Sequence, residues 1–171
     1  LGNDDKLIRR IAEAAESLKP KFIAVLGSPV PMVIGTDFKG IAHEVEYTTG
    51  IPTIGLETRG LAYYGRGIYE ATVEILKRFA KDKLDTVQGT VNLLGVTPLD
   101  FYINSNSQDF IQLFESNGIR VLSCYHMGQN IDDIKNSVAA SLNVAVSQAG
   151  VQVAEYMKSK YGIPYVAGTP L

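Results

Sequence analysis

The feature that most constrains the fold of this chain is a regular alternation of short apolar runs with amphipathic segments. The run Phe22–Leu26 is apolar throughout, as expected of a strand that is buried on both faces. The segments between such runs place apolar residues every three or four positions, which is typical of helices with one buried face. Because parallel strands need crossover connections, this order favours a parallel sheet. We therefore expect an α/β fold, a three-layer Rossmann-like parallel sheet with helices on both faces.

Local signals predict where these elements begin and end. A first helix is expected over residues 4–18, closed by Pro20. The segment Gly27–Pro31 is expected to be a stiff loop, because each proline fixes φ and removes a backbone donor. The next helix should begin near Asp37 and end at Gly50. Further strands are expected at 51–56, 91–95, 120–124, 142–147 and 164–167, and further helices at 68–81, 108–116, 131–135 and 151–160.

Composition excludes several classes of function. Charged residues make up 20% of the chain and the formal net charge is −2, so no basic surface for nucleic acid is indicated. No apolar run approaches the roughly 18 residues that a membrane span needs. We therefore expect a cytoplasmic protein with neither a nucleic-acid nor a membrane partner. The single cysteine, Cys124, excludes an internal disulfide and any all-cysteine metal site built from this chain alone.

Loops that follow the strands are the expected ligand sites, because ligands of open parallel sheets bind outside the carboxyl ends of the strands. The loop 27–35 leads into a helix start, where free N–H groups could meet an anion or a cofactor edge; the alternative is an ordinary βα turn with a cap. The loop 57–67 carries two arginines and two tyrosines, which could hold a partner chain or a planar cofactor with carboxylates. The same side chains could equally be solvated loop residues. Two more loops, 125–130 and 147–150, also qualify.

Two histidines and the cysteine are the other candidates for chemistry. Cys124 and His126 lie at the end of an expected strand, but two ligands do not make a closed metal site, and a buried cysteine is more often a packing residue. His43 lies within an expected helix close to two glutamates, and we expect it to be solvated or to serve as a cap, and not to be catalytic. We predict no metal site within this chain.

The order of the segments resembles one known family. The stretch "KPKFIAVLGSPVPMVIGTDFKGIAHEVEYTTGIPTIGLETRG" is similar to the nitrogenase component 1 pattern, in which a cysteine-containing loop precedes "IGDD", a helix, Gly-Ile-Pro and a strand. "VNLLGV", "GIRVLSCYHMGQNIDDIKNS", "ASLNVAVS" and "AEYMKSKYGIPYVAGTP" follow in the family's order and spacing. The resemblance covers nearly the whole chain and depends on collinearity, not on a single motif.

This resemblance implies a domain organisation and a set of partners. It makes residues 1–83 the latter part of a first Rossmann-like domain and 84–171 most of a second, with the charged stretch around Lys81–Asp85 at the boundary. Because the chain opens at Leu1, not at Met, and stops just after a strand, we expect an internal fragment of a longer subunit. Such subunits pair with a homologous subunit, as a homodimer or heterodimer, and receive electrons from an ATP-dependent iron-sulfur reductase component.

Two departures from the family pattern concern its metal ligands. The cysteine that ligates the interface iron-sulfur cluster falls on Pro29, which has no donor side chain. The cysteine that ligates the active-site cofactor falls on Ser147, which is either a relic ligand or a plain serine at a strand end. By position in the pattern, the cofactor-binding residues are expected to be Gly27, Ser28, Pro29, Thr58, Gly60 and Ser147.

Two functions follow from the resemblance. The first is a domain of a nitrogenase component 1-like oxidoreductase that reduces a small molecule or a tetrapyrrole, with no cofactor bound by this segment alone and any iron-sulfur cluster in the parent or its partner. The fragment alone is then expected to be inactive, and no catalytic residue is assigned. The second is a non-catalytic module on the same scaffold that binds a metal complex or a tetrapyrrole, or that serves cofactor assembly.

Overall fold

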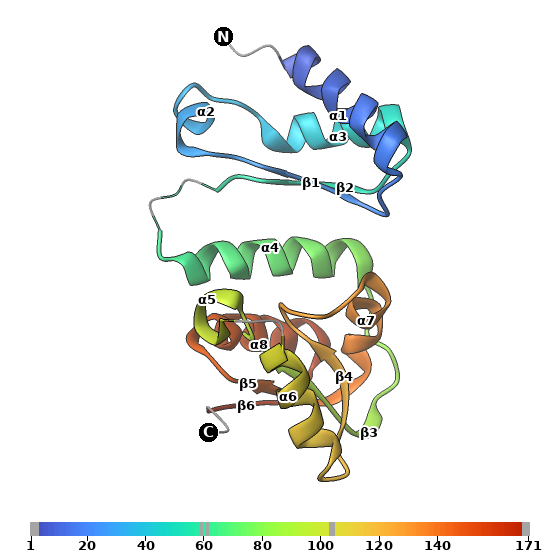
Figure 1. Ribbon diagram of the computed structural model, residues 1–171, viewed down its shortest axis with the longest axis vertical. Coiled ribbons are helices and arrows are strands. Elements are labelled where there is room, and N and C mark those ends of the chain that lie inside the picture. Colours follow the sequence, from blue (N-terminus) through green and yellow to red (C-terminus); the bar gives the residue numbers. More distant parts are fainter. Residues whose placement is uncertain (1–3, 59, 61, 103–104, 169–171) are drawn as a thin grey trace. The chain divides into compact units, whose positions relative to one another are not determined.

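The computed structural model describes residues 4–58, 60, 62–102 and 105–168, and these form two compact units (Figure 1). Unit 1 is Leu1–Gly67 and unit 2 is Ile68–Leu171. The division falls before the charged stretch at Lys81–Asp85, because most of the helix α4 (Tyr64–Phe79) belongs to unit 2. The assignment of residues 1–83 and 84–171 to two successive Rossmann-like domains stays a prediction.

Unit 1 is a pair of parallel strands covered by helices on one face. β1 (Ile23–Leu26) pairs with β2 (Thr53–Leu56) in parallel, and α3 (Phe38–Thr49) makes the crossover between them. α1 (Asp4–Leu18) packs beside α3 on the same face (Figure 1). The core of this unit is made of buried apolar side chains from β1 and α3, namely Val25, Phe38, Ile41, Ala42 and Val45.

Unit 2 contains a four-stranded parallel sheet in the order β4-β3-β5-β6. Its strands are β3 (Val87–Leu94), β4 (Arg120–Cys124), β5 (Ala140–Ala145) and β6 (Tyr165–Ala167). The chain moves from β3 outward to β4, then crosses back over β3 to β5 and on to β6. Because crossovers in parallel sheets are right-handed, this reversal places helices on opposite faces and creates a topological switch point between β3 and β5.

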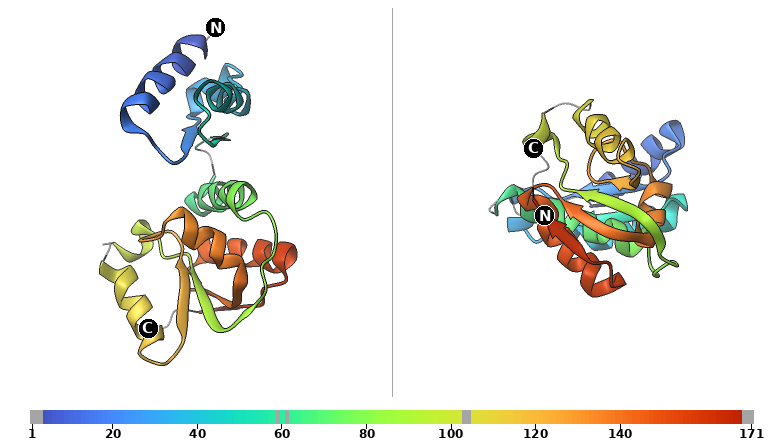
Figure 2. Two further views of the ribbon diagram at one scale, coloured as in Figure 1. Left: turned by 90° about the vertical axis from the view of Figure 1, so that its right-hand side faces the viewer. Right: turned by 90° about the horizontal axis from the view of Figure 1, so that it is seen from below.

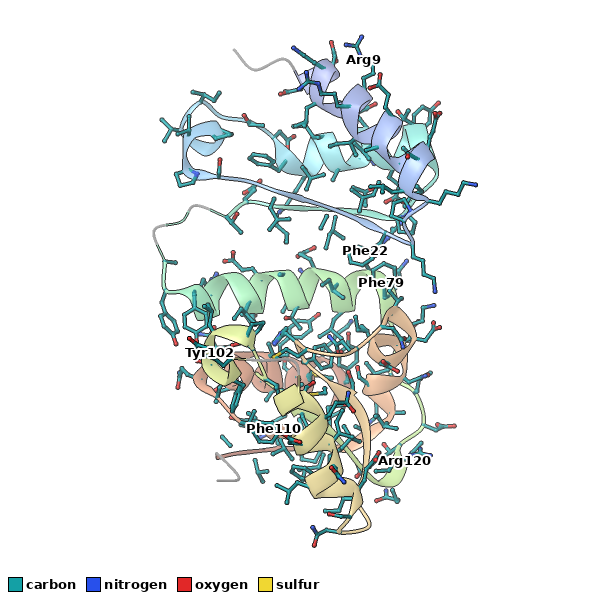
Figure 3. All side chains as sticks on the ribbon, viewed as in Figure 1. Arg9, Phe22, Phe79, Tyr102, Phe110 and Arg120 are labelled. Atoms are coloured by element: carbon teal, nitrogen blue, oxygen red, sulfur yellow. The ribbon has the colours of Figure 1, made fainter. Side chains whose placement is uncertain are left out.

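Helices cover both faces of the sheet in unit 2. α6 (Ser105–Glu115) and the short α5 (Pro98–Phe101) cover one face. Phe110 of α6, labelled in Figure 3, packs edge-on against Phe101 with 5.0 Å between the ring centroids. α4, α7 (Ile131–Asn136) and α8 (Gln148–Tyr161) pack on the other face. Figure 2, right, shows α6 and α8 on opposite sides of these strands. The expected α/β fold with parallel strands and helices on both faces of a sheet is thus confirmed in this unit.

A buried pair of amides joins the two central strands. Asn92 of β3 and Asn143 of β5 are neighbours in the register and both are fully buried. Asn92 Nδ2 donates to Asn143 Oδ1 at 2.8 Å and to the carbonyl oxygen of Ser137 at 2.8 Å. These bonds satisfy Asn92 Nδ2 and Asn143 Oδ1, whereas Asn92 Oδ1 is buried without a partner among the described residues, at a cost of about 1–3 kcal/mol.

Helix and strand types agree with the sequence expectations, with corrections at some bounds. The segment Gly27–Pro31 is not a loop throughout, because α2 (Pro29–Val33) begins at Pro29, where a missing N–H costs nothing in a first helical turn. The short α5 was also not expected; it follows Thr97, whose hydroxyl accepts the Asp100 N–H. α4 begins at Tyr64, four residues earlier than expected. No helix in the described residues combines the length and apolar character that a bilayer crossing needs.

Candidate functional site

Five of the six expected site residues lie at the carboxyl edge of the sheet in unit 1, namely Gly27, Ser28, Pro29, Thr58 and Gly60. The hydroxyl of Thr58, after β2, donates to the carbonyl oxygen of Gly27, after β1. Gly27 N donates in turn to Leu56 O at 2.8 Å. A Cβ built on Gly60 would lie 2.9 Å from Cγ of Pro29, so these two residues approach closely. The loops after the two strands are therefore joined into one structure.

Local packing explains why small residues occupy this edge. A Cβ on Gly27 would lie 2.8 Å from Cε2 of the buried Phe38 ring, so only glycine fits without displacing that ring. Ser28 and Pro29 are exposed at the beginning of α2. Arg59 lies outside the described residues. The structure thus brings Gly27, Pro29, Thr58 and Gly60 together, while their role in cofactor binding stays a prediction.

The nearby helix start is already capped. Asp37 Oδ1 accepts from Lys39 N at 3.1 Å and from Gly40 N at 2.9 Å, which satisfies two of the amide groups that an anion would need. A carboxylate in this position also repels anions. Of the two interpretations of loop 27–35, these bonds favour an ordinary βα turn with a cap over an anion site.

Ser147 lies at the switch point of unit 2. It immediately precedes α8, but its side chain makes no capping bond to the helix and donates from Oγ to Gly95 O at 2.7 Å. Gly95, just after β3, has φ +86°, and a Cβ there would lie 2.6 Å from Gly150 N. The exit of β3 and the start of α8 are therefore in close contact, with Ser147 bonded between them.

Cys124 and His126 have separate environments at the end of β4. Cys124 is buried against α6, and burial raises the pKa of its thiol to about 12, so it stays protonated at neutral pH. Burial lowers the pKa of His126 to about 4, so its imidazole is neutral. His126 Nε2 lies 2.6 Å from the Thr72 hydroxyl of α4. Sequence reasoning missed Thr72, since nothing local links residues 54 positions apart.

The residues at the two family positions do not fit an iron-sulfur cluster. Pro29 has no donor atom, and the hydroxyl hydrogen of Ser147 is committed to Gly95 O. Clusters are held by several thiolates, and the chain has one cysteine, whose thiol is buried and protonated. Among the described residues no three His, Cys, Asp or Glu side chains lie close enough to hold a metal ion.

Comparisons with known proteins agree with this architecture. The chain is 34% identical over 99 residues to one subunit of the light-independent protochlorophyllide reductase of Pelodictyon phaeoclathratiforme, covering 57% of this chain and 18% of that protein. It is 21% identical over 180 residues to the corresponding reductase subunit of Staurastrum punctulatum, covering 99% of this chain and 35% of that protein. A solved structure, nitrogenase Cp1 at pH 6.5, matches with a TM-score of 0.79 and 23% identity, covering 98% of this chain and 32% of that chain.

The chain spans about a third, or less, of the length of these relatives. The match to the solved structure supports the fold, since its sequence identity is low. The family model described as nitrogenase component 1 type oxidoreductase matches residues 1–171, which is the entire chain. With the collinear segments, the parallel α/β units and this match taken together, the chain belongs to the nitrogenase component 1-type oxidoreductase family.

Proposed function

We propose that this chain is part of an oxidoreductase subunit that reduces a small molecule or a tetrapyrrole with electrons from an ATP-dependent iron-sulfur partner. The observation that carries the proposal is the family match over residues 1–171. The names of the relatives support it, since they are subunits of a reductase that acts on protochlorophyllide. A homologous subunit is the proposed dimer partner, and the cytoplasm the proposed location.

In this proposal the carboxyl edges of the two units form the surfaces that face cofactor, substrate or partner. Gly27, Ser28, Pro29, Thr58 and Gly60 contribute backbone and small side chains from unit 1, and Ser147 contributes the switch point of unit 2. Gly27 and Gly95 carry no side chain at these edges, but the contacts that require glycine there, with the Phe38 ring and with Gly150, are internal packing contacts, so the roles in binding depend on the positions of these residues in the family pattern. The redox centre is proposed to be held mostly by residues outside this segment or by the partner, because Pro29 offers no ligand.

Anaerobic purification of the full-length protein with its reductase component tests this function. Iron content and ATP-dependent electron uptake are measured together. Iron bound to the assembled protein and electron uptake that requires ATP are the expected results. Absence of both iron and electron uptake, in a preparation shown to be folded, would refute the proposal. Residues 1–171 alone are expected to take up no electrons.

A second candidate function is non-catalytic binding of a metal complex or a tetrapyrrole. The observation that favours it is the loss of both family ligands, at Pro29 and at Ser147, where the serine hydroxyl is engaged with Gly95. The two functions differ in a simple way: a binding module retains its ligand unchanged in the presence of ATP and the reductase component. Absorbance titration with tetrapyrroles measures binding, and incubation with the reductase component measures conversion. No spectral change at high micromolar tetrapyrrole argues against the binding module.

A further inference from the structure

The turn that ends α6 contains the one asparagine of the sequence that is followed by glycine. Asn117 and Gly118 are both exposed, and they connect α6 to β4. Gly118 N donates to Glu115 O at 3.0 Å and Ile119 N donates to Phe114 O at 3.1 Å, which are the two bonds of a Schellman motif. Gly118 has φ +77°, as the residue after a helix has in this motif.

An asparagine followed by glycine is the pair of residues best suited to ring closure along the backbone. The backbone nitrogen of the second residue can attack Cγ of the asparagine and close a five-membered ring. A side chain on the second residue hinders this approach, and glycine has none. No described atom outside the neighbouring residues lies within 4 Å of a Cβ built on Gly118, so the ring and an attacking water molecule both have room.

We propose that Asn117 is a site of spontaneous deamidation. The nitrogen of Gly118 loses its proton and bonds to Cγ of Asn117, the bond from Cγ to Nδ2 breaks, and ammonia leaves. Water then adds to one of the two carbonyl carbons of the cyclic imide and opens the ring. Opening at one carbonyl gives aspartate, and opening at the other gives isoaspartate, which has one extra carbon in the backbone. No atom is oxidised or reduced, and water is the only co-reactant.

Two hydrogen bonds slow this reaction in the folded chain. Asn117 Nδ2 donates to Leu113 O at 2.8 Å, and the Gly118 N–H that must be lost is bonded to Glu115 O. Both bonds have to open before the ring can close, so bonds of ordinary net strength protect the folded chain by about 10-fold to 100-fold relative to the unfolded chain. Because the turn is exposed at a helix end, this opening does not require the core to unfold.

The product changes the charge at the end of α6. A carboxylate at position 117 is ionised at neutral pH, and it cannot donate to Leu113 O as Asn117 Nδ2 does. It adds a second negative charge beside Glu115, at the helix end where the dipole disfavours anions. The last turn of α6 has no basic residue to compensate. Deamidation should therefore weaken the end of this helix.

The weakened helix end covers part of the core of unit 2. Phe114 and Ile119, which flank the turn, pack against the buried cluster that contains Cys124. Loss of the turn should therefore make the Cys124 thiol more accessible to reagents from solvent. This inference is independent of the proposed function, since it depends only on the turn between α6 and β4.

Peptide mass spectrometry of the folded chain, incubated at mildly alkaline pH, tests the proposal. Deamidation raises the mass of a peptide by about 1 Da, and we expect this change at Asn117 before any other asparagine. The exposed Asn130 and Asn136, each followed by a larger residue, are controls within the same chain. The reaction at Asn117 should be about 10-fold to 100-fold faster in urea. Asn117→Gln should not react on this timescale, since it would have to close a larger ring.

Two results would overturn the proposal. One is a folded chain in which Asn117 reacts no faster than Asn136. The other is protection of Asn117 by more than about 1000-fold relative to the chain in urea, because the reaction would then need global unfolding.

A pair of variants tests the consequence for the fold. Asn117→Asp should lower the Tm by about 2–5 °C and speed the labelling of Cys124 by iodoacetamide. Asn130→Asp is the matched control, because the same charge change falls at the N-cap of α7, where aspartate caps as well as asparagine. Equal Tm values for the two variants, with Cys124 labelled as slowly as in the wild type, would contradict the predicted weakening of α6.

Discussion

Replacement of Gly95 by alanine should be among the most damaging small substitutions in unit 2. The residue has φ +86°, and alanine in the left-handed region costs about 1–2 kcal/mol. The added Cβ would also lie 2.6 Å from Gly150 N and 2.8 Å from Gly150 Cα, both backbone atoms that can yield only if α8 moves. Forcing extra volume into a packed region adds about 1–3 kcal/mol. We therefore expect Gly95→Ala to lower the free energy of unfolding of unit 2 by about 2–5 kcal/mol.

Gly118→Ala separates the two contributions. Gly118 has φ +77°, close to that of Gly95, but no atom lies within 4 Å of a Cβ built on it. This variant should therefore show only the backbone cost of about 1–2 kcal/mol. Urea unfolding followed by circular dichroism measures both variants, and hydrogen–deuterium exchange of β3 and β5 peptides assigns the loss to unit 2. Equal destabilisation by the two variants would refute the close contact between the β3 exit and α8.

Three further outcomes are expected. Asp37→Ala should lower the free energy of unfolding by about 1 kcal/mol, because it removes the N-cap of α3. Asp37→Asn should be nearly as stable as the wild type, and thermal unfolding of both variants measures the difference. Burial lowers the pKa of His126 in the folded state from 6.5 to about 4. The unfolded state therefore binds a proton at a higher pH than the folded state does. The free energy of unfolding should fall, on the order of 1–3 kcal/mol, as the pH decreases from about 6.5 to about 4. Urea unfolding at several values between about pH 7 and about pH 4 measures this pH dependence of the free energy of unfolding. His126→Asn should remove the dependence, and His43→Ala should retain it. Cys124 should resist iodoacetamide at neutral pH in the folded chain and react fully in urea; rapid stoichiometric labelling of the folded protein, read by mass spectrometry, would contradict its burial.

Element types could be predicted from the sequence because local pattern and tertiary packing agree in this chain. The apolar run before Gly27 becomes β1, and Asp37 and Gly50 delimit α3 as their capping chemistry indicates. The short α2 and α5 could not be predicted, because both begin at or next to prolines that are equally compatible with loops. That the described residues of unit 1 form one pair of strands could not be predicted either, since the number of strands in a sheet depends on tertiary pairing.

The candidate site, too, could be predicted from the sequence only in part. Collinear motifs placed Gly27, Thr58 and Ser147 at strand ends, and the parallel topology does put those ends at the carboxyl edges of the sheets. The hydrogen bond from Ser147 to Gly95 and the contact between the side chains of His126 and Thr72 join residues more than 50 positions apart. Such pairs depend on register and helix placement, which one sequence does not encode as a local pattern.

The buried amides of Asn92 and Asn143 have a consequence for how this chain can change over time. Loss of the Asn92 amide leaves the buried Asn143 Oδ1 without its donor, at about 1–3 kcal/mol, and loss of the Asn143 amide removes one of the two acceptors of Asn92 Nδ2. Exchange of both for apolar residues of similar shape is close to neutral. Each single step therefore crosses a less stable intermediate. We expect the two positions to be inherited as a unit among relatives, with amides at both or at neither, and a double-mutant cycle on the chain measures the coupling that enforces it.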